Sequence, residues 1–187
     1  MTRIVAALYV DKHGPYPKML GVQAWSKEYD AMRYIFPNPV VAHPPCGPWG
    51  NLLSACTKQD PETGVRAVIQ VARFGGVLEH PAGSRLWKHM GLPLPGDMSD
   101  PGFYTIETEQ CRWGHKALKK SWFLFSRIQR GDLLPIPPFI EPTHVIDSAP
   151  SKKKRGAPAR HLPKSQRHLT PHRLAEWLIA AARKARA

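Results

Sequence analysis

Residues 39–50 read PVVAHPPCGPWG, residues 62–74 read ETGVRAVIQVARF, and residues 76–81 read GVLEHP. The first and last of these stretches contain short apolar runs, which are typical of strands buried on both faces of a parallel sheet. Between them, four apolar residues from Val65 to Ala72 recur at helical spacing. Strand, helix and strand in this order predict a βαβ unit, and therefore an α/β fold.

The rest of the chain continues this alternation. Four more strands are expected from further apolar runs, at residues 3–10, 22–25, 103–108 and 121–125. Ser26 is typical of a helix N-cap and predicts a helix as far as Phe36, and residues 84–90 predict a short helix. We therefore expect one compact domain over residues 1–147, built on a mostly parallel sheet.

The composition changes after Asp147. Residues 148–170 contain no carboxylate, carry the run Lys152, Lys153, Lys154 and Arg155, and are interspersed with proline, glycine and serine. This composition predicts an extended basic arm. Thr170 is typical of an N-cap, and the apolar face formed by Leu174, Trp177, Leu178 and Ala181 predicts a helix over residues 171–187 that docks on the domain.

The chain has 187 residues and a net charge of +13, which favours phosphate backbones or anionic surfaces as partners. Its three cysteines are an odd and sparse set, and no signal peptide is evident, so we expect a reduced, cytoplasmic setting rather than a disulfide framework. No apolar stretch approaches the roughly 18 residues of a membrane span, so we do not expect a protein embedded in a membrane.

Chemically competent side chains follow two of the predicted strands. Cys46 lies in a proline-stiffened loop directly after the strand at 39–43, and Glu79 lies at the end of the strand at 76–81. Ligands of open α/β sheets bind beyond the carboxyl ends of the strands, so we expect the thiol and the carboxyl group to face one pocket. That pair suits covalent attack on a pyrimidine ring, with the carboxyl group bonding and protonating a ring nitrogen. The structural alternatives are a small buried cysteine and a carboxylate that caps the next helix.

These segments resemble the DNA cytosine-5 methyltransferases. The PPC at 44–46 is similar to the Pro-Cys loop of that family, the LEHP at 78–81 to its Glu-Asn-Val strand end, and Gln110-Cys111-Arg112 to its Gln-x-Arg motif. A closer likeness is to short phage-encoded proteins that carry HPPC, then LEHP, then Gln-x-x-Trp-Gly-His-x-x-x-Lys. The last of these motifs is matched here from Gln110 to Lys119.

The resemblance implies a Rossmann-like methyltransferase fold and a mechanism. Cys46 would attack carbon 6 of a flipped cytosine in DNA, Glu79 would engage ring nitrogen 3, and S-adenosylmethionine would give a methyl group to carbon 5. Arg112 would hold the base or the Glu79 carboxylate, and Gln110, His115 and Lys119 would contact the DNA or substrate. On the cofactor side we expect Pro44 and Asp11, although Asp11 could equally shape its turn. The charge run predicts DNA contacts from Lys152, Lys153, Lys154 and Arg155, with a solvated segment or a nuclear-localisation patch as alternatives. The turn after the first strand, DKHGPYP, has one glycine where the family has a glycine-rich turn.

Two other classes of protein are compatible with the same residues. A zinc protein could draw ligands from the His43-x-x-Cys46 and Cys111-x-x-x-His115 spacings and from His80. A non-catalytic nucleic-acid-binding protein, built on a degenerate methyltransferase fold, would need only the basic charge and bases stacked on tryptophan. The tryptophans in question are Trp49, Trp87, Trp113 and Trp122, which are otherwise expected in the core.

Overall fold

A six-stranded sheet forms the centre of the molecule. It belongs to a computed structural model that describes residues 2–26, 30–50, 60–97, 100, 102–146 and 160–186. The strands lie in the order β2-β1-β3-β4-β6-β5. Their bounds are β1 Val5–Leu8, β2 Val22–Trp25, β3 Val40–Ala42, β4 Gly76–Pro81, β5 Phe103–Glu109 and β6 Lys120–Ser126. The strands β1 to β4 are mutually parallel, whereas β6 runs antiparallel to both β4 and β5. The predicted α/β class with a mostly parallel sheet is confirmed.

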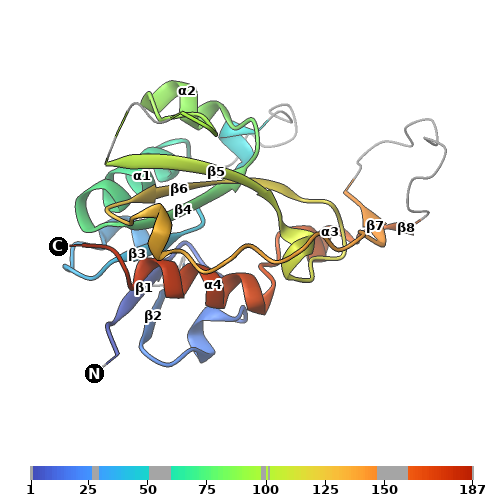
Figure 1. Ribbon diagram of the computed structural model, residues 1–187, viewed down its shortest axis with the longest axis horizontal. Coiled ribbons are helices and arrows are strands. Elements are labelled where there is room, and N and C mark those ends of the chain that lie inside the picture. Colours follow the sequence, from blue (N-terminus) through green and yellow to red (C-terminus); the bar gives the residue numbers. More distant parts are fainter. Residues whose placement is uncertain are drawn as a thin grey trace.

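Two layers of helices cover the two faces of this sheet (Figure 1). On one face lie α1, Glu62–Phe74, and α2, Arg85–Met90, as predicted. The hydroxyl of Ser84 accepts a hydrogen bond from the Leu86 amide and so caps α2. We expected Ile69 on the buried face of α1, but it is 44% exposed. The polar Gln70 is buried instead, because the protein satisfies its amide: Gln70 donates to the Ala31 carbonyl at 2.8 Å and accepts from the Tyr9 hydroxyl at 2.7 Å.

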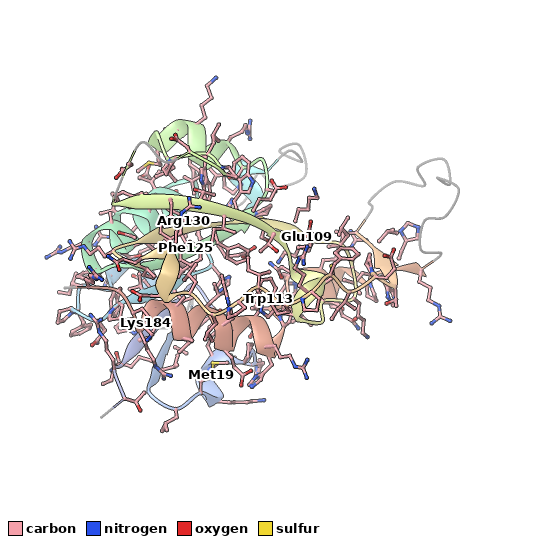
Figure 2. The ribbon with its side chains drawn as sticks, in the orientation of Figure 1. Met19, Glu109, Trp113, Phe125, Arg130 and Lys184 are labelled. Carbon is pink, nitrogen blue, oxygen red and sulfur yellow. The ribbon has the colours of Figure 1, made fainter. Side chains whose placement is uncertain are left out.

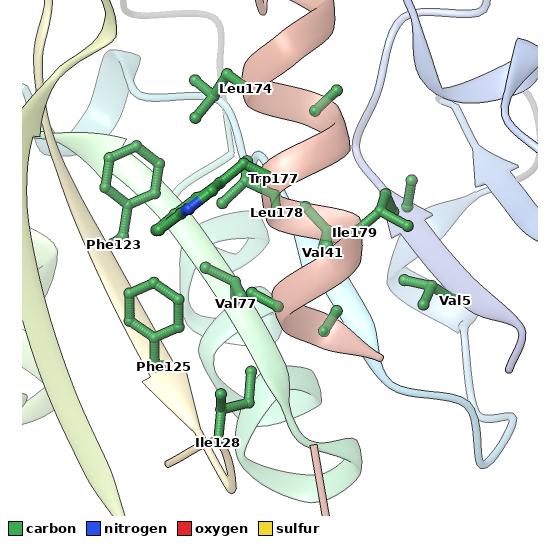
Figure 3. Close-up of a cluster of buried hydrophobic side chains, with 14 of the residues drawn as sticks. Val5, Val41, Val77, Phe123, Phe125, Ile128, Leu174, Trp177, Leu178 and Ile179 are labelled. Carbon is green, nitrogen blue, oxygen red and sulfur yellow. The ribbon is translucent and has the colours of Figure 1, made fainter. Parts of the chain in front are cut away.

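The opposite face is covered by α4, His172–Ala182 (Figure 1). Its predicted apolar face, formed by Leu174, Trp177, Leu178 and Ala181, is buried. Figure 3 shows Trp177 reaching from α4 towards Phe123 and Phe125 of β6. The helix therefore completes the same hydrophobic core as the strands. Thr170 is not its cap: the N-cap position is Pro171, which provides no side-chain hydrogen bond.

The expected helix after Ser26 is not formed over the described part of its range. Asp30 adopts left-handed backbone angles, a single 3-10 turn, η3, spans Ala31–Arg33, and residues 34–36 are not helical. Residues 27–29 lie outside the described residues. The Gln70 side chain bonds the carbonyls of Ala31 and Tyr34, and the Ala31 carbonyl also accepts the Tyr34 amide in the 3-10 turn, so these groups are satisfied without α-helical partners.

The connections place smaller elements around the sheet. Between β1 and β2 lies η1, Tyr16–Lys18, whose Tyr16 is buried in the α4-side core. The other short elements are η4 Gly47–Trp49, η6 Gln110–Trp113, η7 Arg130–Asp132, α3 Lys164–Arg167 and a parallel pair of strands, β7 His144–Val145 and β8 Arg160–His161. In the described ranges, no helix is both long and apolar enough to cross a membrane.

Candidate functional site

Polar side chains gather at the carboxyl edge of the central strands. His43 follows β3, Glu79 lies near the end of β4, and Ser121 lies at the start of the antiparallel β6. Side chains two positions apart on a strand share a face, and the residues two positions from these three belong to the α4-side core. These residues are Val41, Val77 and Phe123. His43, Glu79 and Ser121 are therefore directed to the α4 face of the sheet, at one end of it.

The Glu79 carboxylate is held by three side-chain donors. One oxygen, Oε1, accepts from Gln110 Nε2 at 2.9 Å and from Ser121 Oγ at 2.6 Å. The other oxygen, Oε2, lies 3.1 Å from His43 Nδ1. Gln110 Nε2 also donates to Ser121 Oγ at 2.9 Å, so the donors are themselves linked. Glu79 is 7% exposed and Gln110 and Ser121 are buried, so the network is fixed inside the protein.

Glu79 is a buried carboxylate that remains ionised. Burial alone would raise its pKa, but the positive charge of Lys119 and the contacts of His43 and Ser121 hold the pKa far below its usual value. Lys119 is half-buried. An ionised carboxylate can accept hydrogen bonds and cannot donate them. This property is at odds with the expectation that Glu79 gives its own proton to a ring nitrogen at neutral pH.

Tyr16 extends the network beyond Glu79. Its hydroxyl lies 2.6 Å from His43 Nε2, and the two rings are 5.4 Å apart. Burial, and then the negative charge of Glu79, raise the pKa of Tyr16 well above 10.0, so its hydroxyl keeps its proton. The chain Tyr16–His43–Glu79 was not predicted. Tyr16 carries no local signal, and the position of His43 beside Glu79 depends on the register that pairs Ala42 with Leu78.

The loop that carries Cys46 is pinned by its neighbours. Cys46 is exposed and immediately precedes η4. Arg85 donates to the Pro48 carbonyl at 3.1 Å, and Trp49 Nε1 donates to the Pro61 carbonyl at 3.2 Å. Trp49 also rests on Gly64, where an added Cβ would lie 2.5 Å from the indole nitrogen. These contacts give the thiol-bearing turn a defined conformation. Residues 51–59, which include Cys56, lie outside the described residues.

His80 lies beside this loop on the α1/α2 side of the sheet, next to Trp87. It is fully buried, and neither of its ring nitrogens has a hydrogen-bond partner in good geometry. Burial lowers the pKa of His80 to about 4, against the opposing influence of the Glu79 charge and the Pro45 carbonyl. The imidazole is therefore neutral at physiological pH.

Arg112 does not contact Glu79. Its Nε donates to Glu109 at 2.9 Å, its Nη1 donates to the Pro137 carbonyl at 3.0 Å, and its guanidinium lies over the Phe139 ring. Gln110 takes the place beside Glu79 that the resemblance implied for Arg112. In Figure 2, Glu109 lies at the end of β5, where this second pair is formed.

The remaining residues implied by the resemblance have varied positions. His115 is buried, and its Nδ1 contacts the backbone of Ala117, so it shapes a turn. Asp11 is exposed, and its carboxylate accepts from the His13 amide at 2.8 Å, within the turn after β1. Pro44 is buried beside Cys46. Lys152, Lys153, Lys154 and Arg155 lie outside the described residues.

The residues of the zinc alternative and the tryptophans serve other contacts. His43 is bonded to Tyr16 and Glu79, and Cys111 is 1% exposed. The part of the chain that is described contains no group of three or more His, Cys, Asp or Glu placed to hold a metal ion. Trp87 and Trp113 are core residues, and Figure 2 shows Trp113 close to α4. Trp49 and Trp122 are half-buried.

Comparison of the chain with protein-family models, with curated proteins and with solved structures gives no match. The class that the structure itself defines is an α/β protein with a buried, ionised carboxylate at the carboxyl edge of a mostly parallel sheet, one strand away from an exposed cysteine.

Proposed function

We propose that the protein modifies a pyrimidine base in DNA, with Cys46 as the nucleophile and Glu79 as the residue that binds the base. The observation that carries this proposal is the Glu79 carboxylate, which three donors fix on the α4 face at the end of β4; the neighbouring strand, β3, leads into the Cys46 loop, which packs against α1 and α2. A buried charge is costly unless it is paired and hydrogen-bonded. Three donors around one buried carboxylate therefore favour a functional site.

The ionised state of Glu79 supports cytosine as the target. A carboxylate accepts hydrogen bonds, and cytosine presents an amino group where thymine presents a carbonyl oxygen. The carbonyl of thymine would be repelled by the same carboxylate. We therefore infer that the base is cytosine, held through its amino group.

In the chemical step, the Cys46 thiolate forms a bond from sulfur to carbon 6 of the ring. The electron pair of the double bond between carbons 5 and 6 moves to carbon 5, which becomes nucleophilic. Carbon 5 then forms a bond to the methyl group of an electrophilic donor, whose leaving atom would keep the electron pair of the broken bond. Water takes the proton from carbon 5, the electrons of that C–H bond restore the double bond between carbons 5 and 6, and the sulfur–carbon bond breaks to release Cys46 as the thiolate. Extruding the base from the duplex costs a few kcal/mol, which contacts between the basic protein and the phosphates can offset.

The sheet topology supports a methyltransferase-like domain. In the order β2-β1-β3-β4, the chain changes direction across the sheet between β1 and β3, and ligands of such sheets bind at this switch point. S-adenosylmethionine is the methyl donor that the resemblance implies. The described residues do not form a complete cradle for it: Asp11 bonds within its own turn, and Asp30, the described acidic residue that follows β2, pairs with Arg33 at 2.9 Å. We therefore derive no step from that cofactor.

The test is mass spectrometry of nucleosides from duplex DNA incubated with the protein and S-adenosylmethionine. We expect 5-methylcytosine to appear with the wild-type protein and to be absent with Cys46→Ser, while both proteins bind DNA with the same affinity. Unmodified DNA in the presence of intact, DNA-binding protein would contradict methyl transfer. A zinc ion found by elemental analysis, and lost on substitution of Cys46, would contradict the role of the thiol.

A further inference from the structure

Tyr16, His43 and Glu79 form a directed chain of hydrogen bonds at the α4 face of the sheet. The Tyr16 hydroxyl and His43 Nε2 are 2.6 Å apart, and His43 Nδ1 and Glu79 Oε2 are 3.1 Å apart. Tyr16 is 1% exposed, and the side chains of His43 and Glu79 are 11% and 8% exposed. Water has little access to any of the three groups, so their hydrogen bonds are made within the protein.

The chemistry of the two end groups is compatible with one direction of these hydrogen bonds, from Tyr16 through His43 to Glu79. Glu79 is ionised and can only accept, so His43 Nδ1 must carry the proton that lies between them. Tyr16 keeps its phenolic proton and can donate it to the other ring nitrogen, Nε2. In the tautomer with a proton on Nδ1 alone, Nδ1 is a donor and Nε2 is an acceptor, and this arrangement uses both.

We propose that Tyr16 and His43 are positioning residues: Tyr16 holds His43 in the tautomer with a proton on Nδ1, and His43 uses that proton to orient the Glu79 carboxylate towards the base. This inference rests on the proposed function of Glu79. Gln110 and Ser121 both bond Oε1, so His43 is the donor to Oε2 that stops the carboxylate from turning about its last torsion. The orientation of Oε2 determines where the amino group of a bound base is placed.

The functional test compares four variants. His43→Asn keeps an N–H close to the position of Nδ1, whereas His43→Leu has a similar size and no donor. Tyr16→Phe removes only the hydroxyl. Tyr34→Phe is the matched control, because the Tyr34 hydroxyl bonds the Asn38 carbonyl and takes no part in the hydrogen bonds between Tyr16, His43 and Glu79. We expect kcat to fall 10- to 100-fold in His43→Leu and about tenfold in Tyr16→Phe, with KM for DNA unchanged. Tyr34→Phe should keep full activity, and His43→Asn should recover most of it.

Equal losses in His43→Asn and His43→Leu, in proteins with the same melting temperature, would overturn the proposal. So would full activity in His43→Leu. An effect on KM alone would also contradict it, because a group that orients an already bound base acts on the chemical step.

A second measurement needs no activity and separates this inference from the proposed function. In protein labelled with ¹⁵N at histidine, long-range proton–nitrogen spectra identify which ring nitrogen carries the proton. We expect Nδ1 of His43 to be protonated and Nε2 to be unprotonated at pH 7. A proton on Nε2 would overturn the proposal even in an active enzyme. The expected tautomer in a protein that leaves DNA unmodified would support the positioning chain and reject only the methylation reaction.

Discussion

Buried titratable groups lie on both faces of β4, in consecutive residues. Glu79 faces α4 and is fully supplied with donors, whereas His80 faces α1 and α2 and has none in good geometry. Burial acts on the two pKa values in opposite directions: it raises that of Glu79 and lowers that of His80. The partners of Glu79 outweigh the effect of burial, so the pKa of Glu79 is also lowered. In both cases the protonated form is disfavoured in the folded protein.

His80 makes the stability of the fold depend on pH. Its folded pKa of about 4 lies below its ordinary value of 6.5, so the unfolded chain binds a proton first as the pH falls. The stabilisation is complete above about pH 6.5 and is lost as the pH falls towards 4, with a slope of about 1.4 kcal/mol per pH unit. We expect His80→Leu to reduce the slope of the wild-type unfolding free energy by that amount. Urea unfolding at several pH values measures it, and parallel slopes for the two proteins would contradict the account of His80.

The sequence predicted the individual site residues unevenly. Cys46 and Glu79 could be found because each lies at the end of an apolar run that reads as a buried strand. The roles of Tyr16, His43 and Ser121 could not be found in the same way, because they depend on strand register and on a 3-10 turn far away in the chain. Arg112 shows the same limit: its motif is intact, but Glu109, only three residues away, pairs with its guanidinium.

At the scale of elements, the pairing of β3 with β4 requires a close backbone contact. Gly76, the first residue of β4, has φ of +130°, and a Cβ placed there would lie 1.9 Å from the Val40 carbonyl oxygen. Only glycine allows the two strands to meet at this point. The same pair of strands carries His43 and Glu79 at its other end, so the approach at Gly76 also sets the register of the site.

Gly76→Ala should cost at least about 3 kcal/mol or prevent folding, because it combines an overlap with a disfavoured backbone conformation. Gly83→Ala is the matched control: Gly83 also has positive φ, +76°, but no atom lies near the added Cβ, so we expect a cost of about 1 kcal/mol. Thermal unfolding of both variants checks this, and equal costs would show that the contact with Val40 is unimportant.

Elements with a continuous apolar run were predicted correctly in type, with bounds within one residue for β3 and β4, whereas β1 is two residues shorter at each end than the predicted strand at 3–10. The expected helix from Ser26 to Phe36 is not formed over its described part, because tertiary contacts override its local pattern. Gln70 lies on α1, more than thirty residues further along the chain, and takes the carbonyls of Ala31 and Tyr34 that a helix would have used. The antiparallel course of β6 between β4 and β5 likewise has no local signal in the sequence.

At the scale of the molecule, the C-terminal helix α4 forms one of the three layers. Trp177 is 4% exposed, packs against Trp113, Phe123 and Phe125, and donates to the Leu134 carbonyl at 2.9 Å. The site network lies on the sheet face that this helix covers. Loss of α4 would therefore expose both the core and the network.

Trp177→Ala should destabilise the whole domain by about 3–5 kcal/mol, because it leaves a cavity between α4 and β6. Leu169→Ala, in the segment before α4, serves as the control. Leu169 is 44% exposed, so its truncation should change the free energy of unfolding by less than about 0.5 kcal/mol. A Trp177→Ala protein that unfolds at the wild-type urea concentration would show that α4 is dispensable for the core.

The net charge of +13 is also a property of the molecule as a whole. If the basic arm contacts phosphates, replacing Lys152, Lys153, Lys154 and Arg155 with alanine should weaken DNA binding. The slope of log K against log salt concentration should then fall by up to about 3.6, which is 0.9 for each lost contact. Binding titrations between low and high salt measure this slope, and an unchanged slope would show that the arm does not contact DNA.

The central claim is that the Cys46 sulfur forms a covalent bond to a pyrimidine ring held by Glu79. The most direct measurement uses duplex DNA containing 5-fluorocytosine, which retains the enzyme because fluorine cannot leave carbon 5 as a proton does. With S-adenosylmethionine present, we predict a stable protein–DNA adduct, with peptide mass spectrometry placing the bond on Cys46, and no adduct for Cys46→Ser. DNA that is bound by the wild-type protein but never becomes attached to it, or attachment at a different residue, would contradict the account.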